Sequence, residues 1–163
     1  MLMVVVLSAA ILLVTAFCLK RKRLHLFEIV AIWLAVIVVN APAYSYFLIN
    51  QGWIEVPENR EFALVRIVYT MVLNSLFFAW VLDWALVRLR PLARIPVYLA
   101  MLAVLLGGGW FLDRWGIIRF KPAGWLFYIP LKAIVLLAAL CSVSLVRYLM
   151  RKDGVRIDTV TRN

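Results

Sequence analysis

Residues 1–23 read MLMVVVLSAAILLVTAFCLKRKR, a mostly apolar run that ends in four consecutive basic residues. The same pattern recurs along the 163-residue chain, of which 66% is hydrophobic, so that short Lys and Arg clusters separate long apolar segments. A soluble domain of this length cannot bury so much apolar surface. The pattern therefore predicts a chain whose helices have lipid as their main solvent.

The apolar segments have the length of membrane-crossing helices, since a helix needs about 20 mostly apolar residues to cross a hydrocarbon core roughly 30 Å thick. We predict an all-α integral membrane bundle of five transmembrane helices, over residues 1–19, 24–50, 62–87, 95–112 and 124–150. Residues 1–150 then form a single membrane domain and residues 151–163 a short cytoplasmic tail.

The first segment differs from a signal peptide in the order of its parts. Its basic residues follow the apolar run, whereas in a signal peptide they precede it, and Phe17, Cys18 and Leu19 make a poor cleavage site. We therefore expect a retained helix.

The basic clusters predict the orientation, because cytoplasmic loops carry an excess of Lys and Arg. Three clusters, in residues 20–23, 88–94 and 147–156, share one side if five helices alternate. The acidic connection over residues 55–61 suits the outer side, but the basic connection over residues 113–121 does not. We expect a plasma membrane protein, bacterial in character, with its N-terminus outside and its C-terminus in the cytoplasm.

The formal net charge of +10 would suggest nucleic-acid binding in a soluble protein. Here the positive residues flank apolar segments, where the topology rule and anionic lipid headgroups already account for them. We therefore expect the lipid bilayer and its anionic headgroups as partners, and no nucleic acid.

No arrangement of residues typical of catalysis or of metal binding appears in the sequence. There is no Ser, His and Asp set and no Gly-rich phosphate loop, so we name no catalytic residue. His25 and Glu28 share a helix face but are too few for a metal site, and Lys22 and Arg23 are the expected ion-pair partners of Glu28. We expect no metal and no cofactor.

Small residues indicate how the helices pack. Cys18 and Cys141 lie within apolar segments and favour a packing role over a disulfide. Gly107, Gly108 and Gly109 lie near the outer end of the fourth predicted helix. We expect the helix to fray there, the alternative being a break that lines a cavity.

Polar residues inside the predicted helices are the natural place to look for function, because an unpaired charge at the bilayer centre costs at least about 2.5–3.5 kcal/mol. Asn40 lies beside Pro42, where we expect a kink. Arg66, Thr70 and Asn74 recur at every fourth position and so form a polar stripe on the third predicted helix.

The fifth predicted helix contributes a buried cation. Lys132 lies about 12 Å below the start of this helix, which is too deep for its ammonium group to reach water comfortably. By depth, Asp113 is its expected acidic partner. We predict that Lys132 and Asn74 point into the bundle and not toward lipid.

Two functions are consistent with these residues. We predict a non-enzymatic multi-pass membrane protein that acts through helix–helix or partner binding, the partner being another membrane protein or a second copy of the chain. The alternative is a small transporter or solute-binding subunit, with an outward-facing pocket for an anionic solute formed by Asn40, Arg66, Asn74 and Lys132. A membrane enzyme comes third, because the polar residues lack a base and a nucleophile within plausible reach.

Overall fold

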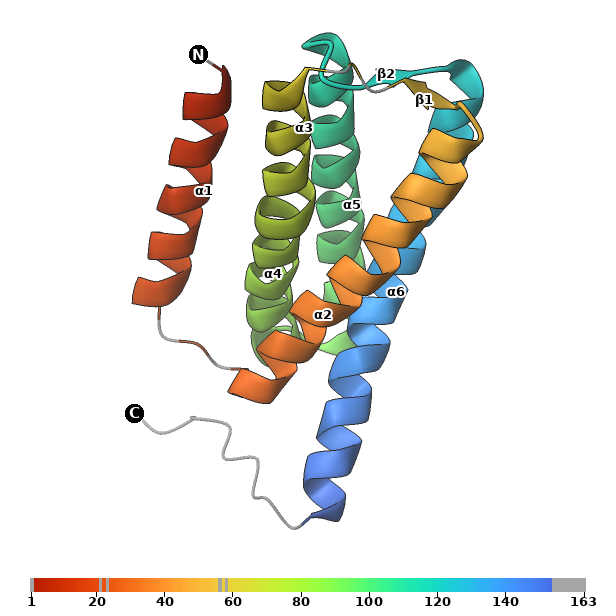
Figure 1. Ribbon diagram of the computed structural model, residues 1–163. Coiled ribbons are helices and arrows are strands. Elements are labelled where there is room, and N and C mark those ends of the chain that lie inside the picture. The colour runs from red at the N-terminus through yellow and green to blue at the C-terminus, as the bar shows by residue number, and fades with distance from the viewer. Residues whose placement is uncertain (1, 21, 23, 56, 58, 154–163) are drawn as a thin grey trace.

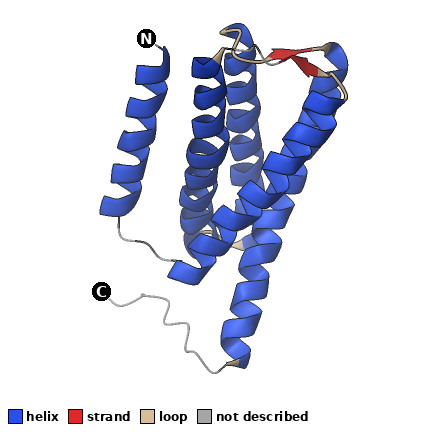
Figure 2. Cartoon of the chain, in the orientation of Figure 1, coloured by secondary structure: helices blue, strands red, loops and turns tan. Residues whose placement is uncertain are grey.

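A computed structural model describes residues 2–20, 22, 24–55, 57 and 59–153. Almost all of the described chain is helical, and a pair of two-residue strands closes one end of the molecule (Figure 2). The elements in chain order are α1 (Leu2–Leu19), α2 (Leu26–Ala43), the π-helix η1 (Tyr44–Asn50), β1 (Ile54–Glu55), α3 (Arg60–Ile67), the π-helix η2 (Val68–Leu73), α4 (Asn74–Arg88), α5 (Pro91–Arg114), β2 (Arg119–Phe120) and α6 (Pro122–Lys152).

These elements form five helical rods, because η1 continues α2, and η2 joins α3 to α4 (Figure 1). The predicted all-α class is confirmed. Four segments are long and apolar enough to cross a membrane, namely Leu26–Tyr46, Arg60–Arg88, Pro91–Arg114 and Pro122–Lys152. The apolar helix Met3–Leu19 is shorter than these four, so its crossing of the membrane stays a prediction.

The rods alternate in direction, and this places all connections at two ends of the bundle (Figure 1). At one end β1 pairs with β2 in antiparallel register, with Glu55 opposite Arg119, and Lys121 forms an ion pair with Glu55 at 3.3 Å. The basic connection over residues 113–121, which does not suit the outer side by the positive-inside rule, therefore lies beside Glu55 of the acidic connection. We call this the hairpin end. We call the opposite end the basic end, since Lys20, Lys22 and residues 88–94 and 147–152 lie there.

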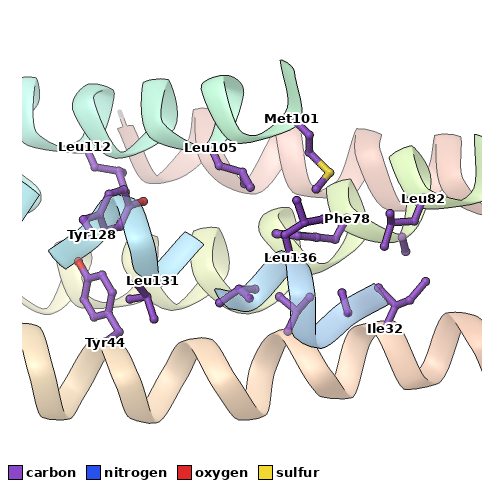
Figure 3. Packing of buried hydrophobic residues seen from close by; sticks show 14 of the residues in the cluster. Ile32, Tyr44, Phe78, Leu82, Met101, Leu105, Leu112, Tyr128, Leu131 and Leu136 are labelled. Atoms are coloured by element: carbon purple, nitrogen blue, oxygen red, sulfur yellow. The ribbon is translucent and has the colours of Figure 1, made fainter. Parts of the chain in front are cut away.

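The core lies where α2 crosses α6, the most extensive helix pair in the bundle. Ile32 of α2, Phe78 and Leu82 of α4 and Leu136 of α6 meet there in a continuous apolar cluster (Figure 3). No more than a third of the most apolar window of each long segment is buried inside the bundle. The remaining apolar side chains face outward, as in helices surrounded by lipid.

The three glycines of α5 do not fray the helix, and the expected fraying is wrong. α5 continues without a break through Gly107–Gly109 to Arg114. A Cβ atom on Gly108 would lie 2.0 Å from Tyr69 Oη, and one on Gly109 would lie 2.6 Å from Tyr128 Cε1. These two glycines therefore leave room for two tyrosine rings from neighbouring rods.

The backbone changes from α-helix to π-helix close to Pro42, while the kink expected at this proline stays a prediction. Pro42 lies inside α2, and two residues later the chain changes to η1. Proline lacks a backbone donor, which disturbs the regular hydrogen-bond ladder around it. A second π-helix, η2, lies in the third rod without any proline, between Ile67 and Asn74.

Replacing Gly109 by Ala should destabilise the bundle by about 1–3 kcal/mol, because the added methyl group would overlap the buried ring of Tyr128. Gly107→Ala is the matched control, since nothing lies within 4 Å of its Cβ position and alanine favours a helix. Thermal unfolding of the purified protein in detergent should rank Gly109→Ala below the parent protein and Gly107→Ala level with it or above it. Equal midpoints for the two variants would contradict this packing.

Candidate functional site

Among the described residues, six polar ones are buried in the bundle, each no more than 3% exposed. Buried polar residues are rare in membrane helices, and each must find a partner or serve a function. The six are Glu28, Asn40, Asn74, Ser75, Asp83 and Lys132. The expected inward orientation of Lys132 and Asn74 is confirmed.

Lys132 connects α6 with α2. Its Nζ donates a hydrogen bond of 2.9 Å to Oδ1 of Asn40 and lies 4.9 Å from the centre of the Tyr128 ring. The expected pairing with Asp113 is wrong, because Oδ1 of Asp113 accepts a hydrogen bond from the backbone N–H of Phe120 at 3.0 Å. No ion pair among the described residues includes Lys132. An amide oxygen and an aromatic face therefore supply its polar contacts.

A layer of tyrosines lies one helical turn from this hydrogen bond, toward the hairpin end. Tyr44 is four residues after Asn40, and Tyr128 is four residues before Lys132. Figure 3 shows the ring of Tyr44 extending from its rod toward Tyr128. Tyr69, which comes from η2, lies against Gly108 of α5, next to Gly109, against which Tyr128 lies. These three tyrosines come from three rods.

Arg66 lies beside this layer. Its guanidinium group is 5.9 Å from the centre of the Tyr44 ring, a cation–π distance. No hydrogen bond, ion pair or ring contact among the described residues joins Arg66 directly to Lys132. Both cations contact the rod of α2 and η1: Arg66 lies against Tyr44, and Lys132 binds Asn40.

Asn74 is buried at the start of α4, but its amide group, unlike that of Asn40, has no described hydrogen bond to a lysine. Its Nδ2 has no hydrogen-bond partner among the described residues, and the same holds for Ser75 Oγ and Tyr44 Oη. Thr70 donates its hydroxyl proton to the carbonyl oxygen of Arg66 at 2.8 Å, within the same rod. In the predicted stripe, Asn74 is therefore buried, Thr70 bonds to its own helix, and Arg66 faces the ring of Tyr44.

The structure thus joins Asn40 to Lys132, places Arg66 against Tyr44, and leaves Asn74 without a described contact to any of the three. Sequence reasoning missed the tyrosines. A signal for two of them was present in the spacing, since Tyr44 follows Asn40 and Tyr128 precedes Lys132 by one turn. Tyr69 likewise follows Arg66 by three residues, about one turn.

A second group of buried polar contacts connects the rods at the basic end. The Nε atom of Arg147 lies 2.5 Å from Oε1 of Glu28, while Oε2 of Glu28 accepts a hydrogen bond from the backbone N–H of His25 at 2.7 Å. The expected partner Lys22 instead lies 5.0 Å from the Phe17 ring, and Arg23 is outside the described residues. Glu28 is therefore an interhelical ion-pair residue that also caps its own helix.

Asp83 performs a similar role between α4 and the first connection. It accepts a hydrogen bond of 2.8 Å from the backbone N–H of Leu24, and its other oxygen lies 3.6 Å from Lys20 Nζ. His25, Glu28 and Asp83 do not gather at one point: the described residues contain no group of three or more His, Cys, Asp or Glu that could hold a metal ion.

A hollow of about 560 Å³ lies between α1, α4 and α5. Its wall is almost entirely apolar, and Lys20 is the one charged residue among the described residues that line it. We call this hollow the α1 groove. Its lining residues are Leu13, Lys20, Phe77, Trp80, Val81, Trp84, Val97, Ala100, Met101 and Val104.

No family model, curated protein or solved structure matches the chain. Function must therefore be argued from the two features above, the buried polar contacts around Lys132 and the α1 groove.

Replacing Asn40 by Leu should destabilise the bundle by about 1–3 kcal/mol, because the buried ammonium group of Lys132 would lose its hydrogen-bond acceptor. Lys132→Met should leave stability unchanged or raise it, since it removes a buried charge and keeps the apolar stem. The double variant should then recover most of the loss caused by Asn40→Leu. Thermal unfolding of all four proteins measures this coupling, and strictly additive effects would show that the hydrogen bond contributes nothing.

Proposed function

We propose that the protein is a non-enzymatic integral membrane protein that acts by binding a partner inside the bilayer, at the α1 groove. It crosses the plasma membrane of a bacterial cell five times, with the N-terminus outside and the C-terminus in the cytoplasm. The basic end then faces the cytoplasm and its anionic headgroups. A cytoplasmic reporter that is active when fused within residues 54–61 would overturn this orientation.

The observation that carries the proposal is the chemistry of the α1 groove. A wall of apolar side chains offers a polar solute no hydrogen bonds, so the groove suits an apolar occupant that enters sideways from lipid. The buried polar residues support the same reading, because Asn40 with Lys132 and Glu28 with Arg147 are contacts between rods. Such contacts hold membrane helices together.

The attachment of α1 also favours partner binding. α1 packs along α3 and η2 and makes fewer contacts with α4, so the groove opens on the side of α1 that faces α4 and α5. Figure 1 shows α1 as the outermost rod of the bundle. A partner could therefore reach the groove without any displacement of the crossing between α2 and α6.

A photoreactive amino acid in place of Val104 should form a discrete adduct in cell membranes, because this side chain is 58% exposed and lines the groove. Leu137 of α6 is the matched control position, since it is 60% exposed and does not line the groove. Mass spectrometry of the purified, irradiated protein identifies the adduct. The proposal fails if the two positions give the same adducts.

We propose an anion-binding site around Lys132 as a second candidate function, with Asn40, Arg66 and Asn74 as further contributors. The observation in its favour is an excess of donors: Nδ2 of Asn74 and the hydroxyls of Tyr44 and Ser75 lack partners among the described residues, and Lys132 is in none of their ion pairs. Buried donors without partners and a cation without an ion pair are the kinds of group that bind a carboxylate or a phosphate group.

Acetate or phosphate should raise the unfolding temperature of the purified protein relative to sodium chloride at equal ionic strength, if the site binds anions. Lys132→Met should abolish this increase and still leave the protein folded. Arg151→Met is the control, because Arg151 is an exposed cation at the other end of the same helix. An increase that survives Lys132→Met would exclude the site.

A further inference from the structure

We propose that the occupant of the α1 groove is one acyl chain of an anionic phospholipid from the leaflet at the basic end, with Lys20 binding its phosphate. This inference rests on the proposed binding function and names the chemistry of the partner. Three observations carry it: the extent of the groove, its volume and the position of its one charge.

The groove extends along only part of the bundle. Its wall consists of Leu13 of α1, Lys20 directly after α1, residues 77–84 of α4 and residues 97–104 of α5, so the outermost wall positions on each rod lie seven residues apart. By helical rise, seven residues cover about 10 Å, whereas the whole hydrocarbon core measures about 30 Å. One leaflet accounts for half of this core, about 15 Å, so the groove fits within a single leaflet, on the side of the basic end.

This extent suits a lipid chain better than a partner helix. A helix that crosses the membrane is about 10 Å wide and 30 Å long, which corresponds to a volume on the order of 2,000 Å³. The groove has about 560 Å³, and its lining stops near the middle of the bundle. A single acyl chain needs no hydrogen bonds from the wall, and the wall offers almost none.

The spacing of the wall residues explains why apolar side chains line the groove. Phe77, Trp80, Val81 and Trp84 follow the i, i+3, i+4, i+7 pattern of one helix face, and Val97, Ala100, Met101 and Val104 repeat the same pattern on α5. Two apolar faces therefore line the same channel. Trp84, at the basic end of the wall, has a ring of the kind that favours headgroup depth.

Lys20 supplies the charge that selects an anionic headgroup. Its Nζ lies 5.3 Å from the centre of the Trp80 ring and 3.6 Å from an oxygen of Asp83, which is longer than a hydrogen bond. Asp83 and Trp80 thus hold the ammonium group at the mouth of the groove without using its donors in short hydrogen bonds. The side chain is 34% exposed, so a phosphate group can reach it from the headgroup region.

The charge of the lipid can be tested with two matched lysine variants. Native mass spectrometry of the purified full chain in detergent should show that it retains phosphatidylglycerol more strongly than phosphatidylcholine with the same chains. Lys20→Gln should reduce this preference about fivefold, the effect of one cation near an anionic surface. Lys22→Gln should not, because Lys22 lies against Phe17, outside the groove. Equal preferences in the two variants would overturn the assignment of the phosphate to Lys20.

The position of the chain can be tested with two matched alanine variants of α5. Ala100→Phe should fill the groove and reduce the number of retained lipids by one, whereas Ala103→Phe adds the same ring at an exposed position outside the wall. Equal lipid retention by the two variants would exclude the groove as the binding site. If Ala100→Phe does not fold, the Lys20→Gln comparison still decides the proposal.

The photoreactive residue at Val104 separates this inference from the function on which it rests. A phospholipid adduct that is enriched over Leu137 supports both. A protein adduct supports partner binding and overturns the lipid assignment. The absence of any adduct specific to Val104 overturns both.

Discussion

The rest of the bundle depends on the crossing of α2 and α6, which two polar contacts hold in register. Lys132 binds Asn40 in one half, and Arg147 binds Glu28 near the basic end, so that a shift of one helix along the other would break both. In an apolar surrounding such a break leaves a buried charge without its partner, which costs far more than an ordinary packing defect. Apolar contacts such as those of Ile32 and Leu136 fill the space between these two points without themselves selecting one register (Figure 3).

Close packing on the hairpin side comes from small residues and large rings in complementary positions. Gly108 and Gly109 of α5 receive Tyr69 and Tyr128, so three rods approach one another through two glycines and two phenol rings. Lipid gives helices little hydrophobic reason to associate, and surfaces that fit closely provide the attraction instead. The π-helix η2 belongs to this arrangement, because Tyr69 lies within it. Two of the tyrosines also present their rings to cations, Tyr128 to the ammonium group of Lys132 and Tyr44 to the guanidinium group of Arg66.

The first rod contrasts with this tight core. α1 is the outermost rod, and its half near the basic end leaves the α1 groove open against α4 and α5. Lys20, directly after α1, also lines this groove, so an apolar hollow and a positive charge meet at one place. A soluble protein would fill such a channel or bind a ligand there. In a bilayer the surrounding lipid is always available to enter it, which gives the groove and the charge of Lys20 a common explanation.

The amino-acid sequence by itself determined the helical class, the approximate segments of the rods and the burial of Lys132 and Asn74, because these follow from apolar length, charge clusters and the cost of burying a polar group near water-free lipid. Only the tertiary structure decided which residues pair with the buried charged groups. Depth along a helix suggested Asp113 for Lys132 and neighbouring positions suggested Lys22 for Glu28, yet Asn40 and Arg147 take these roles, since pairing depends on how rods are rotated and crossed. For the same reason the tyrosine layer, the role of the glycines and the α1 groove could not be read from one sequence: each is a space between segments that lie far apart in the chain.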